Sequence, residues 1–337
     1  MARYRPNPPP ARDGLNPSCV MVPAGAWATA LEFFTWRFDK VARSDWVERF
    51  AAGDVVDEHG TVVRAASPLV TGQRLYYFRD VPDEPHIPFQ ERILYQDSDL
   101  LVVDKPHFLP VIPSGKYVRE TLLVRLGKTL NSSTLAPIHR IDRDTAGIVM
   151  FSLNPATRNA YAQLFRDHAV SKTYHAIAPW NPELQWPIQR HTRIAVGSHF
   201  MQQAEVEGTP NALTTIRPLL HNDTLALYEL KPVNGQRHQL RVHMNAMGLT
   251  ILGDGIYPEL TPEGSANFEK PLQLLAQSIA FTDPVTGETR RFESTLQLSA
   301  LAAIQDARER AALQDVNAAT LATALPVQRA ERNPKPA

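Results

Sequence analysis

The chain has 337 residues, with 35 Lys and Arg balanced by 35 Asp and Glu, so its formal net charge is zero. Hydrophobic residues make up 43% and charged residues 21%, which is typical of a globular protein and excludes a disordered or fibrous chain. The length predicts about two domains. Zero net charge is atypical of a nucleic-acid-binding protein, although the local charge distribution described below argues the other way.

Cys19 is the single cysteine, so neither a disulfide framework nor a cysteine-based zinc cluster is possible within one chain. No run of residues approaches the 18 apolar positions of a transmembrane helix. Residues 1–14 are rich in proline and arginine and lack the apolar core of a signal peptide. These features predict a cytoplasmic protein without a membrane partner.

The N-terminal part is predicted to form a small α/β module over residues 18–80, preceded by a disordered tail over 1–17. Helices are expected over 26–38 and 45–52, the second one capped by Ser44. Short strands are expected on both sides of the turn at 58–60, and a closing strand over 74–78. A polar, proline-bearing linker over 81–90 then marks the domain boundary.

The second part, residues 91–315, is predicted to be a larger domain followed by a flexible tail over 316–337. A hairpin (93–95 and 100–104) comes first, and further helices are expected over 120–130, 155–168 (opened by Pro155), 235–247 and 300–313. Strands are expected over 147–152, 171–178, 212–219, 225–230, 272–281 and 288–292. The irregular order of helices and strands predicts an α+β fold with a mixed, mainly antiparallel sheet.

The densest polar cluster is the loop 139–147, His-Arg-Ile-Asp-Arg-Asp-Thr-Ala-Gly, directly before an apolar strand. A charged loop with local ion pairs is the simpler interpretation. However, its charges alternate without helical pairing, and arginines near Asp142 favour the ionised carboxylate that a nucleophile needs. Asp142 is therefore a candidate catalytic residue.

A second cluster, residues 231–243, contains three cations and no acid. Gly235 is expected to form a tight turn into a helix whose N-terminus could attract phosphate. Arg241 lies between two apolar residues and is expected to point toward structured surroundings. His238 and His243 are five residues apart and lack a companion glutamate, so we expect no metal site.

The strand 171–178 places Lys172, Tyr174 and Ala176 on one face. A tyrosine in a strand most often fills the core or an edge, so this pattern alone does not assign a function to Tyr174.

These motifs, in this order, resemble the RluA-type pseudouridine synthases. The loop 139–147 resembles His-Arg-Leu-Asp-Arg-Asp-Thr-Ser-Gly. The other matching motifs are Asp104-Lys105-Pro106, Lys172-x-Tyr174-x-Ala176, the run 235–243, Gly253-Asp254 with Tyr257, and the strand 274–281 with Asp283-Pro284. The resemblance covers residues 93–292. It departs from the family at Gln236, where arginine is usual, and at Leu275 and Thr282, where histidines are usual.

The resemblance implies an RNA pseudouridine synthase, an isomerase that detaches uracil from ribose and rejoins it through carbon without metal or cofactor. It implies that Asp142 is the catalytic carboxylate, acting as nucleophile or base, that Arg241 pairs with it, and that Tyr174 stacks on the uracil. Arg140 would fill the space left by the flipped base. Further implied RNA contacts are Arg143, Lys105, Lys172, Arg237, His238 and Gln239, and the implied pocket walls are Ile148 and Leu274.

The implied partner is a stem-loop of ribosomal or transfer RNA, and the family-level expectation is a monomer. Residues 18–80 resemble a degenerate copy of the αL-type RNA-binding module. Cations near the catalytic motifs and acids elsewhere make a dipolar surface, so non-specific RNA binding should be modest and weakened by salt.

Two alternatives remain open from the sequence. A glycoside hydrolase could use Asp142 and Asp144 as its paired carboxylates, since residues two apart on a strand share a face. A catalytically silent RNA-binding protein could also retain this fold.

Overall fold

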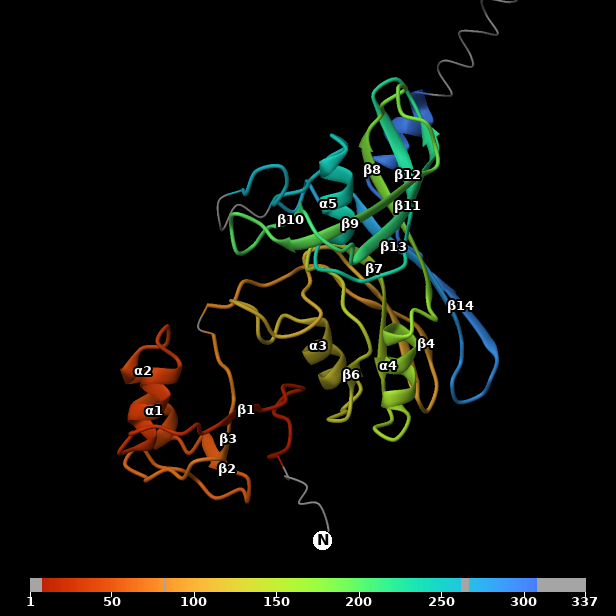
Figure 1. Cartoon of the computed structure of the whole chain (residues 1–337). Helices are drawn as coiled ribbons and strands as arrows, with labels where there is room; N and C mark the ends of the chain where they lie inside the picture. Colours follow the sequence, from red (N-terminus) through yellow and green to blue (C-terminus); the bar gives the residue numbers. More distant parts are fainter. Residues whose placement is uncertain (1–7, 82, 262–266, 308–337) are drawn as a thin grey trace, which may run out of the picture. The chain divides into compact units, whose positions relative to one another are not determined.

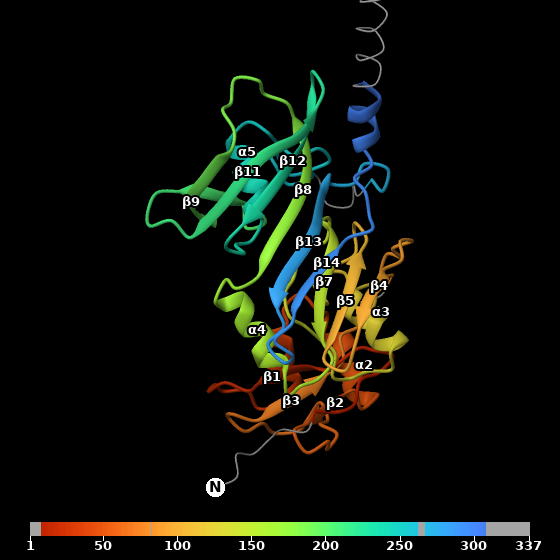
Figure 2. The same ribbon diagram turned by 90° about the vertical axis from the view of Figure 1, so that its right-hand side faces the viewer.

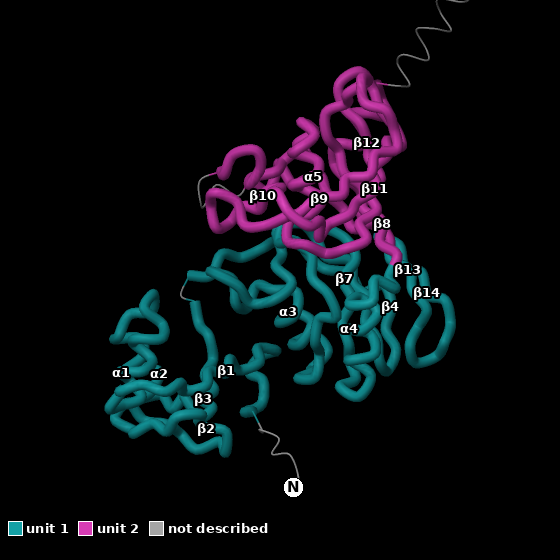
Figure 3. Tube along the Cα trace, viewed as in Figure 1, with its two compact units in different colours: residues 1–170, 279–294 teal, residues 171–278, 295–337 magenta. Residues whose placement is uncertain are grey.

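A computed structural model describes residues 8–81, 83–261 and 267–307. The chain divides into two compact units, each described below by itself (Figure 3). The first unit contains Met1–Val170 and Ile279–Ser294, and the second contains Ser171–Ser278 and the residues from Thr295 onward. The division falls inside one strand, β13 (Leu274–Thr282).

The N-terminal module packs helices α1 (Ala30–Arg37) and α2 (Arg43–Ala51) beside a three-stranded sheet (Figure 1). Its strands are β1 (Ser18–Met21), β2 (Val55–Asp57) and β3 (Arg74–Tyr77), in the antiparallel order β1-β3-β2. Phe34 is wholly buried, and its ring centroid lies 4.7 Å from that of Trp46 and 5.2 Å from that of Phe50. Aromatic side chains bury much area each, which gives this short segment a core.

The two helices begin at different residues from those predicted. α1 begins at Ala30 because the Thr29 side chain accepts a hydrogen bond from the Glu32 N–H. α2 begins before the predicted cap: Ser44 lies inside the helix, and its hydroxyl donates to the carboxylate of Asp45. Strand β1 was not predicted.

The predicted tail and linker both contact the rest of the first unit. Leu15, within the predicted tail 1–17, is buried against Val118 and Val124. Glu84, within the predicted linker 81–90, accepts hydrogen bonds from three successive backbone N–H groups, those of residues 118–120. The linker therefore lies inside the first compact unit because its carboxylate satisfies donors of the following segment.

The remainder of the first unit is a sheet covered on both faces. Strands β4 (Arg92–Gln96), β5 (Leu100–Lys105) and β7 (Ala146–Ser152) pair in the antiparallel order β7-β5-β4, which confirms the predicted hairpin. β6 (Ala136–Pro137) pairs with β7, and β14 (Thr289–Glu293) pairs with β13. Every residue of β5 and β7 is buried, as expected of strands enclosed on two sides.

Two helices belong to this part of the unit. α3 (Leu122–Thr129) packs Leu122 and Leu126 into one apolar cluster, and α4 (Arg158–Arg166) packs Tyr161 into another. α4 begins at Arg158 rather than at Pro155, which precedes the helix.

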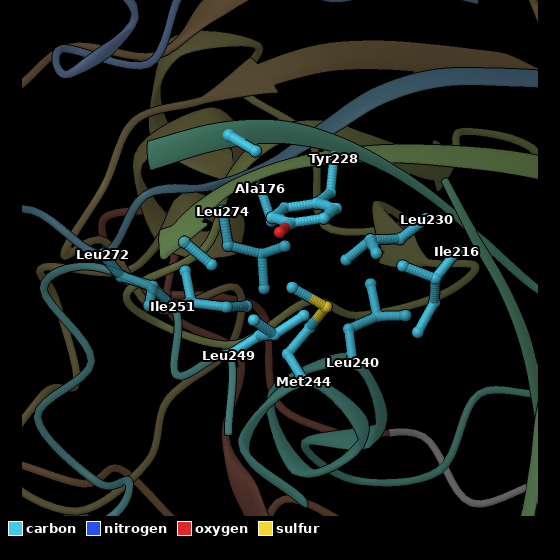
Figure 4. Packing of buried hydrophobic residues seen from close by; sticks show 12 residues of the cluster. Ala176, Ile216, Tyr228, Leu230, Leu240, Met244, Leu249, Ile251, Leu272 and Leu274 are labelled. Carbon is cyan, nitrogen blue, oxygen red and sulfur yellow. The ribbon is translucent and has the colours of Figure 1, made fainter. Parts of the chain in front are cut away.

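In the second unit, helix α5 (Gln239–Ala246) lies against an antiparallel sheet (Figure 2). The strand order is β10-β9-β11-β12-β8, followed by β13. The strands are β8 (Ser171–Pro179), β9 (Ile188–Val196), β10 (Gln203–Val206), β11 (Ala212–His221) and β12 (Leu225–Pro232). Leu240 and Met244 of α5 pack against Ala176 and Tyr228 of the sheet, as Figure 4 shows.

The helix predicted over 235–247 is shorter at its start. His238, the N-cap, has a φ of 56°, and this left-handed turn prevents the helix from extending back to Gly235. Gly235 therefore precedes α5 and does not form the turn at its start, as had been predicted.

Residues 301–307 are helical, with Ile304 buried. The rest of the predicted C-terminal helix and the predicted tail 316–337 lie outside the described residues. The predicted α+β fold with a mainly antiparallel sheet is confirmed. Within the described part of the chain, no helix has the length and apolar character needed to cross a membrane.

Candidate active site

Asp142 lies in the loop between β6 and β7, and the residues on both sides of it are held in place. Ile141 packs against the apolar cluster that contains Leu122 and Val149. The Arg143 carbonyl accepts a hydrogen bond from Lys105 Nζ at 2.9 Å. The Asp142 backbone is thus fixed between a side chain in the core and a carbonyl bound by a buried cation, while the residue itself is half-buried.

The segment after β5 supplies this support. Lys105 is completely buried, and its Nζ also donates to the Pro106 carbonyl at 2.8 Å. Burial lowers the pKa of Lys105 to about 7, a shift that the carboxylates of Asp144 and Asp142 oppose. His107 Nδ1 lies 2.7 Å from the Asp144 carbonyl oxygen and must therefore be the protonated nitrogen.

The start of β7 completes the loop. Gly147 pairs with Lys105 and has a φ of 106°, a conformation that residues with a side chain rarely adopt. On the other side, His139 Nε2 accepts from the Met150 N–H, and its ring stacks on Phe165 with centroids 4.7 Å apart. The motif 139–147 is therefore a rigid loop at the edge of a buried strand, as predicted.

Arg241 is almost fully buried on α5, where Asp254 binds it through two hydrogen bonds. Nε donates to Oδ2 at 2.8 Å and Nη2 donates to Oδ1 at 2.6 Å. Arg241 and Asp254 side chains are only 2% and 1% exposed. The backbone N–H groups of Ile256 and Tyr257 also donate to Asp254. This planar two-point geometry fixes the orientation of the guanidinium.

Gly253 is required for this arrangement. It has a φ of 74°, and an added Cβ would lie 2.4 Å from the Pro271 carbonyl oxygen, so only glycine fits before Asp254. The sequence motif Gly253-Asp254 contained this signal, but the role of Asp254 was not predicted.

Tyr257 connects the ion pair to its surroundings. The guanidinium of Arg241 lies 5.5 Å from its ring centroid. The Tyr257 hydroxyl accepts from the Gln203 N–H at 2.7 Å and lies 3.1 Å from His238 Nδ1. The buried His238 ring is thus held against Tyr257 inside the unit.

Several predicted RNA contacts have structural partners instead. Lys105 is buried and has no surface to offer RNA, so that prediction is corrected. The Gln239 side chain is buried and donates to the Leu213 carbonyl and to the Thr214 hydroxyl. Lys172 Nζ donates to the Val233 and Asn234 carbonyls, which ties β8 to the loop before α5.

The predicted pocket walls are also core residues. Ile148 is 2% exposed and packs with Leu100, Met150 and Tyr161. Leu274 is 3% exposed and lies in the cluster of Figure 4, against which Tyr174 packs from a half-buried position. Both residues support neighbouring side chains from within their own unit.

The remaining predicted residues lie nearer the surface. Arg140 is exposed. Arg143 Nε and Nη2 donate to the two carboxylate oxygens of Asp144. This ion pair favours the ionised carboxylate, whereas a two-carboxylate hydrolase needs a protonated carboxyl as its proton donor. Arg237 is exposed and donates to the Phe200 and Met201 carbonyls, and Gln236 donates to the Asn211 carbonyl.

Asp142, Arg140 and Arg143 thus belong to the first unit, whereas Tyr174, Arg241 and Leu274 belong to the second. Within residues 8–81, 83–261 and 267–307 there is no group of three His, Cys, Asp or Glu side chains arranged to hold a metal ion.

Comparison with known proteins identifies the class. The family model of RNA pseudouridylate synthases matches residues 99–246. An RNA pseudouridine synthase of Synechocystis is 30% identical over 232 residues, covering 67% of this chain and 78% of that protein. The ribosomal large subunit pseudouridine synthase D of Zymomonas mobilis is 27% identical over 294 residues, covering 79% of this chain and 92% of that protein.

A solved structure gives the same result. Human RNA pseudouridylate synthase domain containing 4 is 26% identical, with a TM-score of 0.50 over 64% of this chain and 92% of that one. The fold is thus that of an RNA-modifying isomerase. The chain belongs to the RluA-type RNA pseudouridine synthase family and isomerises uridine in RNA.

We expect Asp254→Ala to lower the free energy of unfolding of the second unit by about 3–5 kcal/mol, because it leaves Arg241 buried without its partner. Chemical denaturation measures this loss. The control is Glu293→Ala, which breaks an ion pair with Arg291 whose side chains are 58% and 63% exposed and should cost about 0–1 kcal/mol. Equal losses in both variants would contradict a structural role for the buried pair.

His243 should make stability depend on pH. Burial lowers its pKa from 6.5 to about 4, with opposing effects from nearby Glu205 and Arg190, and its ring contacts the hydroxyls of Thr192 and Thr214. Below pH 6.5 the unfolded chain binds a proton that the folded chain does not, so stability falls until about pH 4. Denaturation midpoints should decrease across this window and decrease less in His243→Gln. An unchanged slope in that variant would contradict the assignment.

Proposed function

We propose that this enzyme acts on a stem-loop of ribosomal RNA, with Asp142 as its catalytic carboxylate. The observation that carries the proposal is the fixation of the Asp142 loop, which holds Ile141 in the core and the Arg143 carbonyl on the buried Lys105. A carboxylate must approach the ribose in one orientation, and a backbone held on both sides restricts it to that orientation.

The reaction requires one bond to break and another to form. The glycosidic bond between C1′ and N1 is cleaved, the uracil turns, and C5 bonds to C1′. The hydrogen of C5 leaves and N1 is protonated, so atoms and charge balance without an added reactant. Asp142 acts at the ribose as nucleophile or base.

Arg241 is proposed to orient the Asp142 carboxylate, and Tyr174 is proposed to stack on the uracil. Asp254 orients Arg241 through Nε and Nη2, and Arg241 is the residue proposed to bind the Asp142 carboxylate. A guanidinium shared between two carboxylates orients both without neutralising either completely. The half-buried Tyr174, supported by the cluster around Leu274, offers a planar face for uracil.

Ribosomal RNA is the preferred substrate class because of the relative from Zymomonas mobilis, which is a ribosomal large subunit enzyme. Its alignment covers 79% of this chain, a share too large to lie entirely after residue 90, so the similarity includes part of the N-terminal module. Transfer RNA is the competing class, and pseudouridine mapping of total RNA from a strain that lacks this gene distinguishes the two.

We expect Asp142→Asn to abolish turnover while leaving RNA binding within a few-fold of the wild type, because the amide keeps the shape but cannot act as nucleophile or base. RNA labelled with tritium at C5 of uridine releases tritium on isomerisation and measures turnover directly. Retained turnover in the purified variant would refute the role of Asp142.

Arg140 is proposed to occupy the space left by the extruded uridine, since its exposed guanidinium can both stack and bind phosphate. Arg140→Ala should lower kcat/KM about 10- to 100-fold on a stem-loop, by increasing the cost of base flipping, which is a few kcal/mol. The loss should shrink on the same sequence presented as a single strand. An equal loss on both substrates would count against this role.

A further inference from the structure

The turn between β9 and β10, residues 197–202, carries an aromatic side chain that the fold does not need. Phe200 is 72% exposed, the highest value among the large hydrophobic side chains that the structure describes. Val196 and Val206 in the flanking strands are 63% and 41% exposed. Because Val196 and Val206 lie on opposite faces of the hairpin, the exposed ring of Phe200 is the apolar feature that calls for an explanation.

This turn is nevertheless well ordered by hydrogen bonds. The Gly197 N–H donates to the Gln202 carbonyl at 3.0 Å, and the Gln202 N–H donates to the His199 carbonyl at 2.9 Å. The Met201 N–H donates to His199 Nδ1 at 3.2 Å. The rings of His199 and Phe200 lie 4.6 Å apart. The backbone that presents Phe200 is therefore fixed, which lowers the entropic cost of binding a partner.

Arg237 places a positive charge next to the ring. Its Nη1 donates to the Phe200 carbonyl at 3.2 Å and its Nη2 donates to the Met201 carbonyl at 3.4 Å. A guanidinium has five N–H donors, so this exposed side chain can bind these two carbonyls and an anion together. The predicted RNA contact of Arg237 and its observed role in the turn are compatible.

The charge of the hairpin fits a polyanion. Side chains of a strand alternate between its faces. Glu205 lies on the face next to α5, near His243 of that helix, and pairs with Arg190 of β9. Within these two described strands, the opposite face has no carboxylate and presents His191, Arg193, Ala195, Ala204 and Val206. Aromatic rings interspersed with cations are typical of surfaces that bind single-stranded nucleic acid.

The turn is also connected to Arg241. Gln202 Nε2 donates to the Ile256 carbonyl at 2.7 Å, and the next N–H, of Gln203, donates to the Tyr257 hydroxyl. Tyr257 donates its own N–H to Asp254, which binds Arg241. A ligand on the turn is therefore held at a fixed position relative to Arg241.

We propose that residues 197–202 form a second RNA-binding site, in which Phe200 stacks on an unpaired nucleobase and Arg237 donates to the adjacent phosphate. The site rests on RNA being the substrate, and it does not depend on the assignment of Asp142. It binds a nucleotide outside the isomerised uridine, and so it contributes to the choice of RNA.

The test is a kinetic comparison of full-length variants at Phe200. The probe is total RNA from cells that lack this gene and were grown with [5-³H]uridine, and the readout is tritium release against RNA concentration. Phe200→Ala should raise KM about 5- to 100-fold, as expected for loss of one stacked base, with kcat within about twofold. Phe200→Trp should retain the wild-type KM, and Phe200→Leu should not.

The matched control is Leu219→Ala, at an apolar residue of β11 that is 41% exposed and distant in sequence from the turn; its KM should not change. A Phe200→Ala KM within twofold of the wild type would overturn the proposal, as would a wild-type KM in Phe200→Leu, which would show that apolar bulk suffices. If Phe200→Ala fails to fold, the Trp and Leu variants decide.

Failure of the proposed chemistry gives a different result. Asp142→Asn that still releases tritium refutes the catalytic role of Asp142 and leaves the Phe200 comparison intact. If the wild type releases no tritium, filter retention of the same RNA still compares the Phe200 variants, with the same expected loss of affinity for Ala and Leu.

Discussion

The second unit depends on one constraint, which is that α5 carries a buried positive charge, the guanidinium of Arg241. A buried guanidinium is costly unless it is paired and hydrogen-bonded, and Arg241 meets this condition through Asp254. Asp254 in turn requires Gly253 before it and two backbone N–H groups after it. The loop following α5 is therefore shaped around the ion pair, and the ring of Tyr257 lies where the pair and the β9–β10 hairpin meet.

Both units use lysine in the same way near their functional loops. Lys105 binds the carbonyl after Asp142, and Lys172 binds the carbonyls before α5. A lysine ammonium group can satisfy several carbonyls at once, and the complete burial of Lys105 keeps water from competing there. Residues whose charge suggested contact with RNA thus act as internal supports for the loops that present Asp142 and Arg241.

The sequence predicted most of the strands and the motifs, because buried strands leave long apolar runs and the loop 139–147 is distinctive. It did not predict β9 and β10, because residues 189–193 of β9 are all polar and β10 is a short strand at the edge of the sheet. The start of α5 was missed because the left-handed turn at His238 leaves no compositional signal. Lys105 was misassigned because lysine is rarely buried, and only tertiary structure shows the carbonyls that bind it.

The contacts of Glu84 limit how easily the N-terminal module can be exchanged during evolution. The Glu84 carboxylate accepts hydrogen bonds from three successive N–H groups just before α3, while Leu15 packs against Val124 of α3 itself. A module joined only by a flexible linker can be exchanged or lost between relatives without disturbing its neighbour. Here the linker and the segment before the module are structural parts of the first unit, so recombination at residues 81–90 would remove interactions from both sides of the junction.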